Sequence, residues 1–394
     1  MTDGEQRGWP VVIAYASVCA GTQLLWLTYA PIDTGSADYY GVSTAAIGWL
    51  ANVFPLLYVV LAIPAGRLLD SRFRPTLAGA GALMAAGGLV RLGGQAFAWA
   101  LVGQLAIAVA QPFVLSAMGK LAGEYLPVER RPAGIALAST AGFAGMLVAL
   151  LLGPALGGHG HVQRLLAVEA ALGVPAALAL AWALRRPGLA GDDEESAAIE
   201  GGTARSLWAL PQMRTMCGLV FVGFGVFVAL TTWLQTLLHP DGVSEQTAGA
   251  LLVGMLVAGM IGSAVLPPLL ARRAAEPSFM RAAILITAVG CVALAAIPSL
   301  GARAVVLAAM GFVLLPALPV IISLAERLAG RAAGTAGAIV WMAGNLGGLV
   351  LALVVQALVH DATAAFAAMA VAILLGLPFA SRFPSTTTLA PQEL

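Results

Sequence analysis

Charged residues are scarce in this sequence of 394 residues: they make up 10% of it, against roughly 25% in ordinary soluble domains. Hydrophobic residues make up 60%, and the mean hydropathy is +0.92. A chain this apolar cannot cover its surface with polar side chains, because surface area stays large relative to volume. The composition therefore predicts an all-α membrane protein that crosses the bilayer many times.

Cysteine, histidine and net charge are also low, and each excludes a class of protein. The three cysteines (Cys19, Cys217 and Cys291) show no spacing pattern, which excludes a disulfide framework and a cysteine metal site. Of the four histidines only His159 and His161 are close together, so we expect no metal and no cofactor. The net charge is +1 with no basic domain, so nucleic acid is not an expected partner.

Apolar runs between charged residues predict twelve membrane-spanning helices, since each span needs about 20 residues. The predicted spans cover residues 10–32, 44–69, 75–95, 97–122, 132–156, 162–184, 213–238, 246–270, 279–299, 303–325, 333–358 and 361–381. An acidic, glycine-rich stretch separates the first six from the last six. The predicted domains are an N-terminal six-helix bundle (1–184), a cytoplasmic linker (185–211), a C-terminal six-helix bundle (212–382) and a cytoplasmic tail (383–394).

The basic residues predict the orientation of the chain. Of the 20 Lys and Arg residues, all but Arg91, Arg164 and Arg303 fall on the side that holds both termini. This bias places both termini in the cytoplasm of a multi-pass protein of the cell inner membrane or plasma membrane. Arg91, near the outer end of the third span, is expected to extend its guanidinium to the membrane surface.

The two halves carry similar segments. Residues 141–145 (Ala-Gly-Phe-Ala-Gly) on the fifth span correspond to residues 343–347 (Ala-Gly-Asn-Leu-Gly) on the eleventh. The turn after the second span, residues 69–72, corresponds to residues 270–273 after the eighth. Two pseudo-symmetric six-helix halves joined by a linker are typical of transporters that work by alternating access.

Residues 66–74 (Gly-Arg-Leu-Leu-Asp-Ser-Arg-Phe-Arg) resemble the loop signature of the major facilitator superfamily. The match holds at Gly66, Leu68, Asp70 and Arg74, while Phe73 replaces the second glycine of the signature. The resemblance implies the major facilitator fold and a monomer.

A tighter resemblance covers most of the chain. Residues 26–29 (Trp-Leu-Thr-Tyr), 68–75, 103–104 (Gly-Gln) and 111–113 (Gln-Pro-Phe) are similar to the feline leukaemia virus subgroup C receptor-related family, solute carrier family 49. That family implies transport of small amines such as choline or ethanolamine, and haem export has also been attributed to members. The resemblance favours a transporter of a small organic solute, with a choline-like or ethanolamine-like amine as the first candidate.

The family's binding residues carry over in part. The aromatic residue of the first helix matches Trp26, and an amide of the eleventh matches Asn345. The family's glutamine on the fifth helix is replaced by Phe143, and its tyrosine on the seventh falls near Phe227 or Val228. Two of four polar contacts thus differ, which implies another substrate or a more aromatic cage.

The residues themselves support a site on the first and fourth helices. An indole in the middle of a span needs an N–H partner or a cavity, and the Trp26 ring suits a quaternary ammonium, worth about 0.5–2 kcal/mol. Ordinary helix packing is the alternative. Gln23 lies beside Trp26, and Gln104 and Gln111 share one face of the fourth helix, as ligands or as interhelical hydrogen-bond donors. On the eleventh helix, Trp341 lies one turn before Asn345.

Asp70, Arg72 and Arg74 form the most distinctive charged cluster. A carboxylate there can accept hydrogen bonds from the start of the eleventh helix, near Ala333, because helix N-termini attract anions. Pairing with Arg131 is an alternative. Either contact would gate transport by favouring one conformation, whereas the plainer interpretation is a solvated set of topology determinants.

Glu169 is the only acid well inside a span, and it predicts either a proton or cation site or a pair with Arg164. No charged residue lies in the middle of helices 1, 4, 7 or 10, which favours a facilitative uniporter. The alternative is a proton-coupled exporter of drugs, metabolites or haem that uses Asp33 or Glu169. Walker, G-x-S-x-G and H-E-x-x-H motifs are absent, so we expect neither an enzyme nor a catalytic residue.

Overall fold

The computed structural model describes residues 3–157, 161–188 and 204–384. These residues form two units: Met1–Glu195 with Arg331–Ala338, and Ser196–Gly330 with Ile339–Leu394. Most of the predicted linker 185–211 and nearly all of the predicted tail 383–394 lie outside the described residues.

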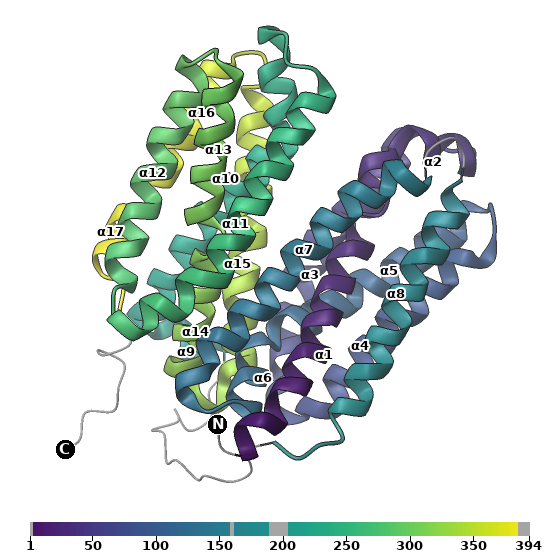
Figure 1. Ribbon diagram of the computed structural model, residues 1–394, viewed down its shortest axis with the longest axis vertical. Helices are drawn as coiled ribbons and strands as arrows, with labels where there is room; N and C mark the ends of the chain where they lie inside the picture. Colours follow the sequence, from purple (N-terminus) through teal and green to yellow (C-terminus); the bar gives the residue numbers. More distant parts are fainter. Residues whose placement is uncertain (1–2, 158–160, 189–203, 385–394) are drawn as a thin grey trace. The chain divides into compact units, whose positions relative to one another are not determined.

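The helices of the first unit follow the predicted spans closely (Figure 1). They are α1 (Asp3–Trp26), η1 (Ala30–Ile32), α2 (Asp33–Tyr40), α3 (Thr44–Ser71), α4 (Phe73–Val90), η2 (Arg91–Gly93), α5 (Phe97–Ser116), α6 (Met118–Tyr125), η3 (Val128–Arg130), α7 (Arg131–Gly157) and α8 (Val162–Ala183). The start of α15 also belongs to this unit, which the predicted boundaries did not include.

The second unit is built in the same way. Its helices are α9 (Ala204–Ala209), α10 (Pro211–Leu238), η5 (His239–Asp241), α11 (Glu245–Arg273), α12 (Glu276–Ala296), α13 (Leu300–Leu314), α14 (Ala317–Ala329), η6 (Gly330–Ala332), α15 (Ala333–Ala357), α16 (Ala362–Leu374) and α17 (Leu377–Ser381). The short helix α9 lies within the predicted linker.

The long helices of the two units correspond to twelve membrane-spanning segments. Among the described residues, 11 stretches are long and apolar enough to cross a membrane, and one of them, Leu300–Ala357, has 58 residues. At about 1.5 Å per residue that stretch is nearly three times the roughly 30 Å of a bilayer core. It turns back at η6, where Gly330 has a φ of +52°, so it holds two spans.

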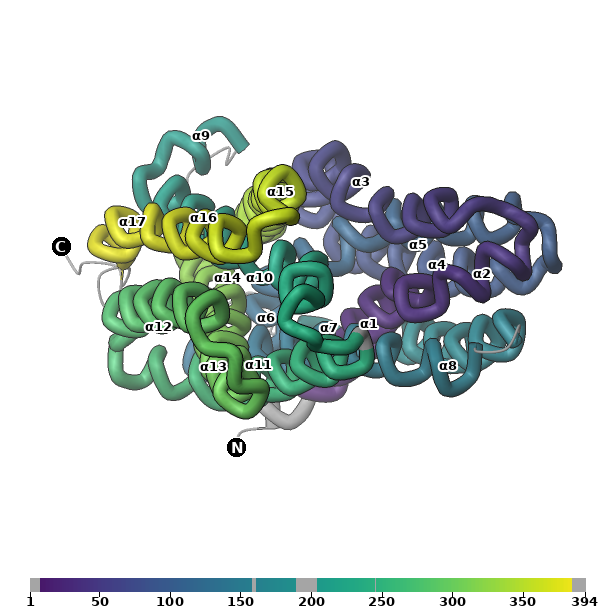
Figure 2. Tube along the Cα trace, turned by 90° about the horizontal axis from the view of Figure 1, so that it is seen from above, coloured from purple at the N-terminus to yellow at the C-terminus, as the bar shows by residue number. Residues whose placement is uncertain are grey.

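Within each unit the helices pack in pairs (Figures 1 and 2). In the first unit α1 packs along α7 and α8, and α5 packs against both α3 and α4. A Cβ on Gly145 of α7 would lie 2.1 Å from the carbonyl oxygen of Ala20 on α1. Only glycine allows this close approach, which brings the two backbones into contact. In the second unit α13 packs on α11, and α12 packs on α16.

Several predicted spans are interrupted. The first was predicted to end at residue 32, but α1 ends at Trp26, and η1 and α2 follow. The fourth span is broken between α5 and α6 at Ala117, and the tenth between α13 and α14 at residues 315–316. Interrupted helices are tolerated in membranes where neighbouring groups bind the freed backbone. At the break between α5 and α6 the Tyr15 hydroxyl donates to the Val114 carbonyl oxygen at 2.6 Å.

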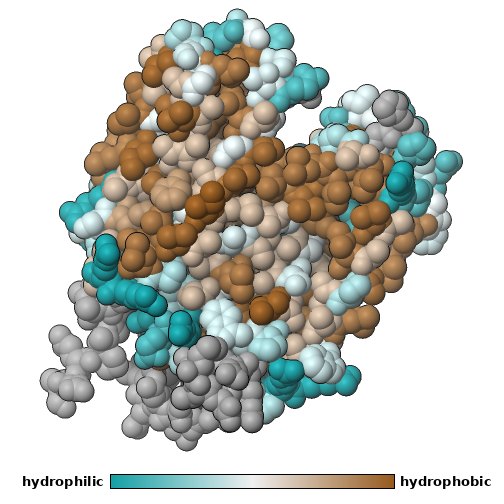
Figure 3. All heavy atoms as spheres, in the orientation of Figure 1, coloured by the Kyte–Doolittle hydropathy of each residue, from teal (hydrophilic) through white to brown (hydrophobic). Residues whose placement is uncertain are grey.

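Large apolar side chains cover the outer faces of the helices. Examples are Val305, Val60 and Leu178, with exposed fractions of 70%, 69% and 65%. In the view of Figure 3 the sides of the helices are mainly hydrophobic, and hydrophilic residues gather toward the helix ends. This pattern fits helices that lie in lipid, where exposed apolar side chains cost nothing.

Candidate functional site

The Trp26 indole lies at the last residue of α1 and is held by α3. Its Nε1–H donates to the carbonyl oxygen of Ala51 at 2.9 Å. That carbonyl is free because Pro55, four residues later, has no N–H to donate to it. The ring is half-buried, with its centroid 6.1 Å from that of Phe54. The N–H partner expected for this tryptophan is therefore present. That hydrogen bond uses the edge of the indole and leaves a face of the ring for another contact.

Two glutamines of the first unit have buried amide atoms without a protein partner. Gln23 lies one turn before Trp26 on α1, is 6% exposed, and its Oε1 has no hydrogen-bond partner in the described structure. Gln111 on α5 is 4% exposed, and its Nε2 is likewise unpaired there. Because an unpaired buried amide is costly, both atoms are suited to a polar ligand or water.

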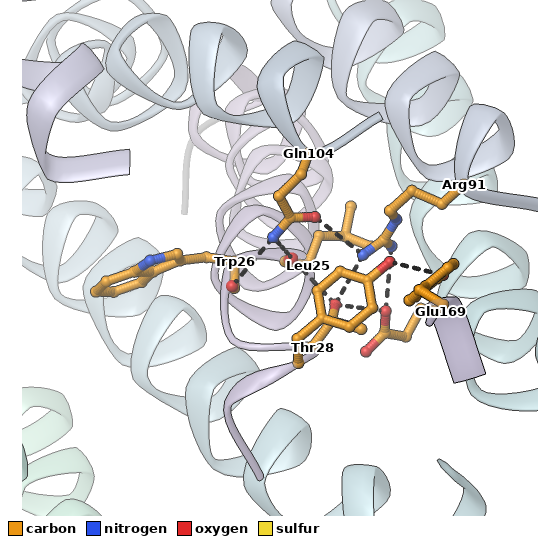
Figure 4. Close-up of polar contacts among 8 residues, drawn as sticks. Leu25, Trp26, Thr28, Arg91, Gln104 and Glu169 are labelled. Carbon is orange, nitrogen blue, oxygen red and sulfur yellow. Dashed lines mark hydrogen bonds and ion pairs between the residues drawn. The ribbon is translucent and has the colours of Figure 1, made fainter. Parts of the chain in front are cut away.

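Gln104 differs from these two because protein groups satisfy its amide (Figure 4). It is fully buried, and its Nε2 donates to the carbonyl oxygens of Leu25 at 3.1 Å and Trp26 at 3.3 Å. Its Oε1 accepts from Arg91 Nη1 at 3.3 Å. Of the two roles considered for Gln104, the structure shows interhelical hydrogen bonding, and we no longer count it among the ligands.

Arg91 and Glu169 correct two expectations. Arg91 does not extend to the membrane surface: it is fully buried and pairs with Glu169, Nη2 to Oε2, at 3.1 Å. Glu169 is also fully buried, so its partner is Arg91 and not Arg164. Thr28 lies between them, accepting from Arg91 Nη1 at 2.8 Å and lying 2.7 Å from Glu169 Oε2 (Figure 4). The two charges come from η2 and α8, which sequence spacing does not relate.

Phe143, at the position where the resembling family has glutamine, is buried on α7. This helix packs along α1, and a Cβ on its Gly142 would lie 3.6 Å from the Gln23 side chain. The first unit thus gathers Trp26, Gln23 and Phe143 on two helices in direct contact, and Gln111 on a third that also packs on α1.

The second unit holds an aromatic cluster. The Phe224 ring lies 5.7 Å from Phe227 on the same helix, α10, and 5.8 Å from Trp341 on α15, edge to face. Asn345 is half-buried, and its Nδ2 donates to the Trp341 carbonyl oxygen at 2.9 Å. Phe227, Trp341 and Asn345 were predicted from the sequence. Phe224 was not, although its position three residues before Phe227 places the two on one helix face.

Asp70 binds the start of α15, as the helix-dipole argument predicts. Its Oδ1 accepts from the Gly334 N–H at 2.8 Å, and its Oδ2 accepts from the Thr335 N–H at 2.9 Å and from the Thr335 hydroxyl. A Cβ on Gly66 would lie 2.6 Å from the Thr335 Cα, so glycine is needed there for the approach. We call Asp70, Lys120, Gly334 and Thr335 the Asp70 cluster.

Lys120, not Arg131, is the cation at Asp70. Its Nζ lies 3.3 Å from Asp70 Oδ1 and donates to the Arg331 carbonyl oxygen at 3.4 Å. Arg131 donates instead to the carbonyl oxygens of Leu126 and Gly123. Lys120 was not among the predicted gating residues, although it is the only lysine in a sequence that otherwise uses arginine.

The other predicted gating residues lie close by. Arg72 is exposed at the junction of α3 and α4. Arg74 pairs with Glu124 at 3.0 Å and lies over the Tyr125 ring, which ties α4 to α6. Burial raises the pKa of the Tyr125 phenol above its ordinary value, against the lowering effect of Arg74, so its hydroxyl stays protonated at neutral pH.

Nothing in the described part of the chain resembles a metal site, since no three His, Cys, Asp or Glu residues come together there. The three cysteines are buried and not joined to one another.

Comparison with known proteins gives one family model, described as the Major Facilitator Superfamily, which matches residues 11–352. Solute carrier family 49 member A3 of Danio rerio is 28% identical over 310 residues, which are 74% of this chain and 65% of the relative. A protein of Rattus norvegicus named choline/ethanolamine transporter FLVCR2 is 25% identical over 283 residues, 66% of this chain and 52% of the relative. The matches therefore span less than two thirds of the relatives' length.

Two solved structures are similar along nearly the whole chain. The human organic anion transporter MFSD10 (TETRAN) has a TM-score of 0.74 at 16% identity and covers 95% of this chain and 99% of its own. The fucose:proton symporter FucP of E. coli has a TM-score of 0.71 at 18% identity, with 94% and 98% covered. At these identities the similarity shows the fold alone.

Proposed function

Because this chain belongs to the Major Facilitator Superfamily, we propose that it transports a small amine of the choline or ethanolamine type by alternating access. The twelve-helix major facilitator fold predicted from the sequence is confirmed. Membership of the superfamily supports transport of a small solute across a membrane. Its resemblance to solute carrier family 49 is also confirmed. The name of the rat relative, a choline/ethanolamine transporter, supports the proposed substrate class.

Trp26 is the observation that carries the proposal. Its N–H donates to the Ala51 carbonyl oxygen, and its ring lies beside Phe54 at the C-terminal end of α1. An indole held in this way presents a face to a quaternary or primary ammonium, worth about 0.5–2 kcal/mol. The unpaired amide atoms of Gln23 and Gln111 would bind the hydroxyl of such a substrate. Phe143 is proposed as a further apolar contact for the substrate.

The second unit supplies a similar set of groups. Phe227 and Trp341, joined by Phe224, are proposed as aromatic ligands, and Asn345 as an amide ligand. Because neither set includes a fixed charge, each set taken by itself suits a cation, a zwitterion or a neutral solute. A carrier of large anions would instead require buried arginine or lysine at the site.

Uniport is favoured over proton coupling by the position of the acids. Glu169, which the sequence places well inside a span, is removed from water and paired with Arg91. Asp33 is exposed at the start of α2 and accepts from the Thr34 N–H. A proton carrier needs a titratable group in contact with the substrate path. The membrane potential would favour uptake of a cation by about 2.3 kcal/mol per 100 mV without any coupled ion.

We propose that the Asp70 cluster is the gate, because Asp70 contacts backbone N–H groups that only one arrangement of α15 presents to it. Arg72, Arg74 and Arg131 are proposed to support it by holding the adjacent helix ends. From the distribution of basic residues we also propose that both termini are cytoplasmic and that the protein lies in the cell inner membrane or plasma membrane. Membership of the superfamily supports the further proposal that it acts as a monomer.

Flux into proteoliposomes tests the proposal. We expect labelled choline or ethanolamine to enter and to equilibrate at the outside concentration, with no change in the final level when a protonophore is added. With equal K⁺ on both sides and valinomycin present, so that no membrane potential drives the cation, accumulation above the outside level that a protonophore abolishes would instead establish proton coupling. Flux of porphyrin but of neither amine would refute the amine assignment.

A further inference from the structure

The buried ion pair of Arg91 and Glu169 is not explained by stability alone. Both side chains are fully buried, and Arg91 Nε and Glu169 Oε1 have no hydrogen-bond partner among the described residues. Burying two charges costs several kcal/mol each, and an ion pair with unpaired atoms recovers this cost poorly. A pair of apolar side chains would fill the same space with less penalty, so the position of the charges invites another explanation.

The pair is directed at the broken end of α1. After Trp26 the helical hydrogen-bond pattern stops: the Ala30 N–H donates to the Leu27 carbonyl oxygen, and Pro31 has no N–H. The carbonyl oxygens of the last helical turn therefore need partners from elsewhere. In apolar surroundings an unmet carbonyl is especially costly.

Gln104 supplies those partners, and Arg91 fixes how it does so. A guanidinium only donates hydrogen bonds, so Arg91 Nη1 turns the amide oxygen of Gln104 toward itself. The NH₂ group of Gln104 is thereby directed at the carbonyl oxygens of Leu25 and Trp26 (Figure 4). With the amide reversed, its oxygen would face two carbonyl oxygens and repel both.

Thr28 fixes the next part of the break. Its hydroxyl accepts from Arg91 Nη1 and has one hydrogen, which lies within reach of Glu169 Oε2 at 2.7 Å and of the Leu25 carbonyl oxygen at 3.0 Å. The Arg91 guanidinium also lies over the Tyr29 ring, 6.0 Å from its centroid. The ion pair thus contacts Thr28 and Tyr29, after Leu27, directly, and it acts on Leu25 and Trp26, before Leu27, through Gln104.

Close packing lets the arginine reach this position. A Cβ on Gly103 of α5 would lie 2.5 Å from Arg91 Cγ and 2.5 Å from the carbonyl oxygen of Gly87 on α4. Glycine at these two positions brings α4 and α5 together and leaves room for the stem of Arg91. The side chain can therefore reach Thr28 without leaving the bundle.

We propose that Arg91 and Glu169 are positioning residues: through Gln104 and Thr28 they hold the broken end of α1, and with it the Trp26 indole, in the arrangement that binds the amine. The inference rests on the proposed function for its binding readout. Ala51 anchors the ring, and the ion pair anchors the backbone that carries it.

Two measurements on the purified full-length protein test the proposal: the choline Kd, and hydrogen exchange of the backbone amides in the peptide that spans residues 25–32. Gln104→Leu removes the amide at similar volume and keeps the ion pair. We expect it to raise the choline Kd about tenfold, the effect of leaving a buried carbonyl unpaired, and to speed exchange in this peptide. Gln163→Leu is the matched control, because Gln163 on α8 donates to the Gly94 carbonyl oxygen, away from α1.

The ion pair is tested with the double variant Arg91→Met/Glu169→Leu, which leaves neither charge alone and should unfold near the wild-type temperature. A structural role alone predicts wild-type Kd and exchange for this variant, whereas positioning predicts the same changes as in Gln104→Leu. Where the double variant does not fold, Gln104→Leu decides. In the Trp26→Ala background, the additional change Gln104→Leu should alter the choline Kd less than threefold. Both substitutions act through the Trp26 indole, which is already absent in that background.

The possible results separate the two proposals. Unchanged Kd and unchanged exchange in Gln104→Leu, with choline binding lost in Trp26→Ala, would overturn the positioning role and leave the proposed function standing. If the wild type binds no amine, the proposed function fails, and hydrogen exchange still decides the positioning role. Faster exchange in Gln104→Leu but not in Gln163→Leu would then support it, and equal exchange in both would overturn it.

Discussion

Asp70→Asn is the substitution that tests the gate. Asparagine has nearly the same shape as aspartate but keeps one acceptor oxygen and has no charge. Asp70 uses both oxygens, on the N–H groups of Gly334 and Thr335 and on the Thr335 hydroxyl. The variant should therefore weaken the contact with the start of α15 without creating a cavity.

The expected size of the effect follows from the contacts that are lost. A hydrogen bond to a charged group contributes about 1.5–3 kcal/mol, and a charge at a helix N-terminus about 0.3–2 kcal/mol. The carboxylate is 17% exposed, so screening by water reduces both contributions, and the pair with Lys120 adds at most about 1 kcal/mol. A net loss of about 2 kcal/mol shifts the equilibrium between conformations about 30-fold.

Initial rates of choline uptake and the equilibrium Kd are the measurements. Turnover should fall about tenfold or more, while the Kd changes less than about threefold, because Asp70 does not contact the proposed ligands. Asp361→Asn is the matched control: Asp361 also accepts from a helix N-terminus, the Ala364 N–H of α16, and asparagine is an equally good N-cap. Equal turnover of Asp70→Asn and the wild type would refute the gating role.

Three further substitutions have defined outcomes. Gly145→Ala places a Cβ against the Ala20 carbonyl oxygen and should destabilise the protein by about 1–3 kcal/mol, seen as a lower unfolding temperature; an unchanged temperature would argue against tight packing of α1 on α7. Pro55→Ala restores an N–H that competes for the carbonyl bound by Trp26, so the choline Kd should rise with little effect on folding. Arg74→Ala breaks a half-exposed ion pair and should change stability by less than about 1 kcal/mol.

The spans and their pairing into two halves were predictable because hydrophobic length and basic residues report directly on the bilayer. The contact between Asp70 and the start of α15 was predictable for a similar reason: a carboxylate at a helix end favours a helix N-terminus. Pairing of Asp70 with Arg131 was the alternative considered, and Lys120 was not predicted as a partner, because sequence neighbours do not show that α6 turns Lys120 toward Asp70.

The network around Arg91 was not predictable from the sequence. Arg91 and Glu169 are 78 residues apart, and each had a plausible local explanation, an extended arginine or a pair with Arg164. The end of α1 was also placed too late, since the apolar run continues past Trp26 although the helix does not. Pro31 was the available signal, because proline disfavours helix in the residues before it.

Equilibrium binding of choline to Trp26→Ala, beside Trp49→Ala, tests the central claim most directly. Trp49 on α3 is 61% exposed, so its loss controls for removal of a tryptophan. We expect Trp49→Ala to bind choline as the wild type does, and Trp26→Ala to bind it about tenfold or more weakly, since one ring contributes up to about 2 kcal/mol. Equal affinity of the two variants would contradict a substrate site at the end of α1.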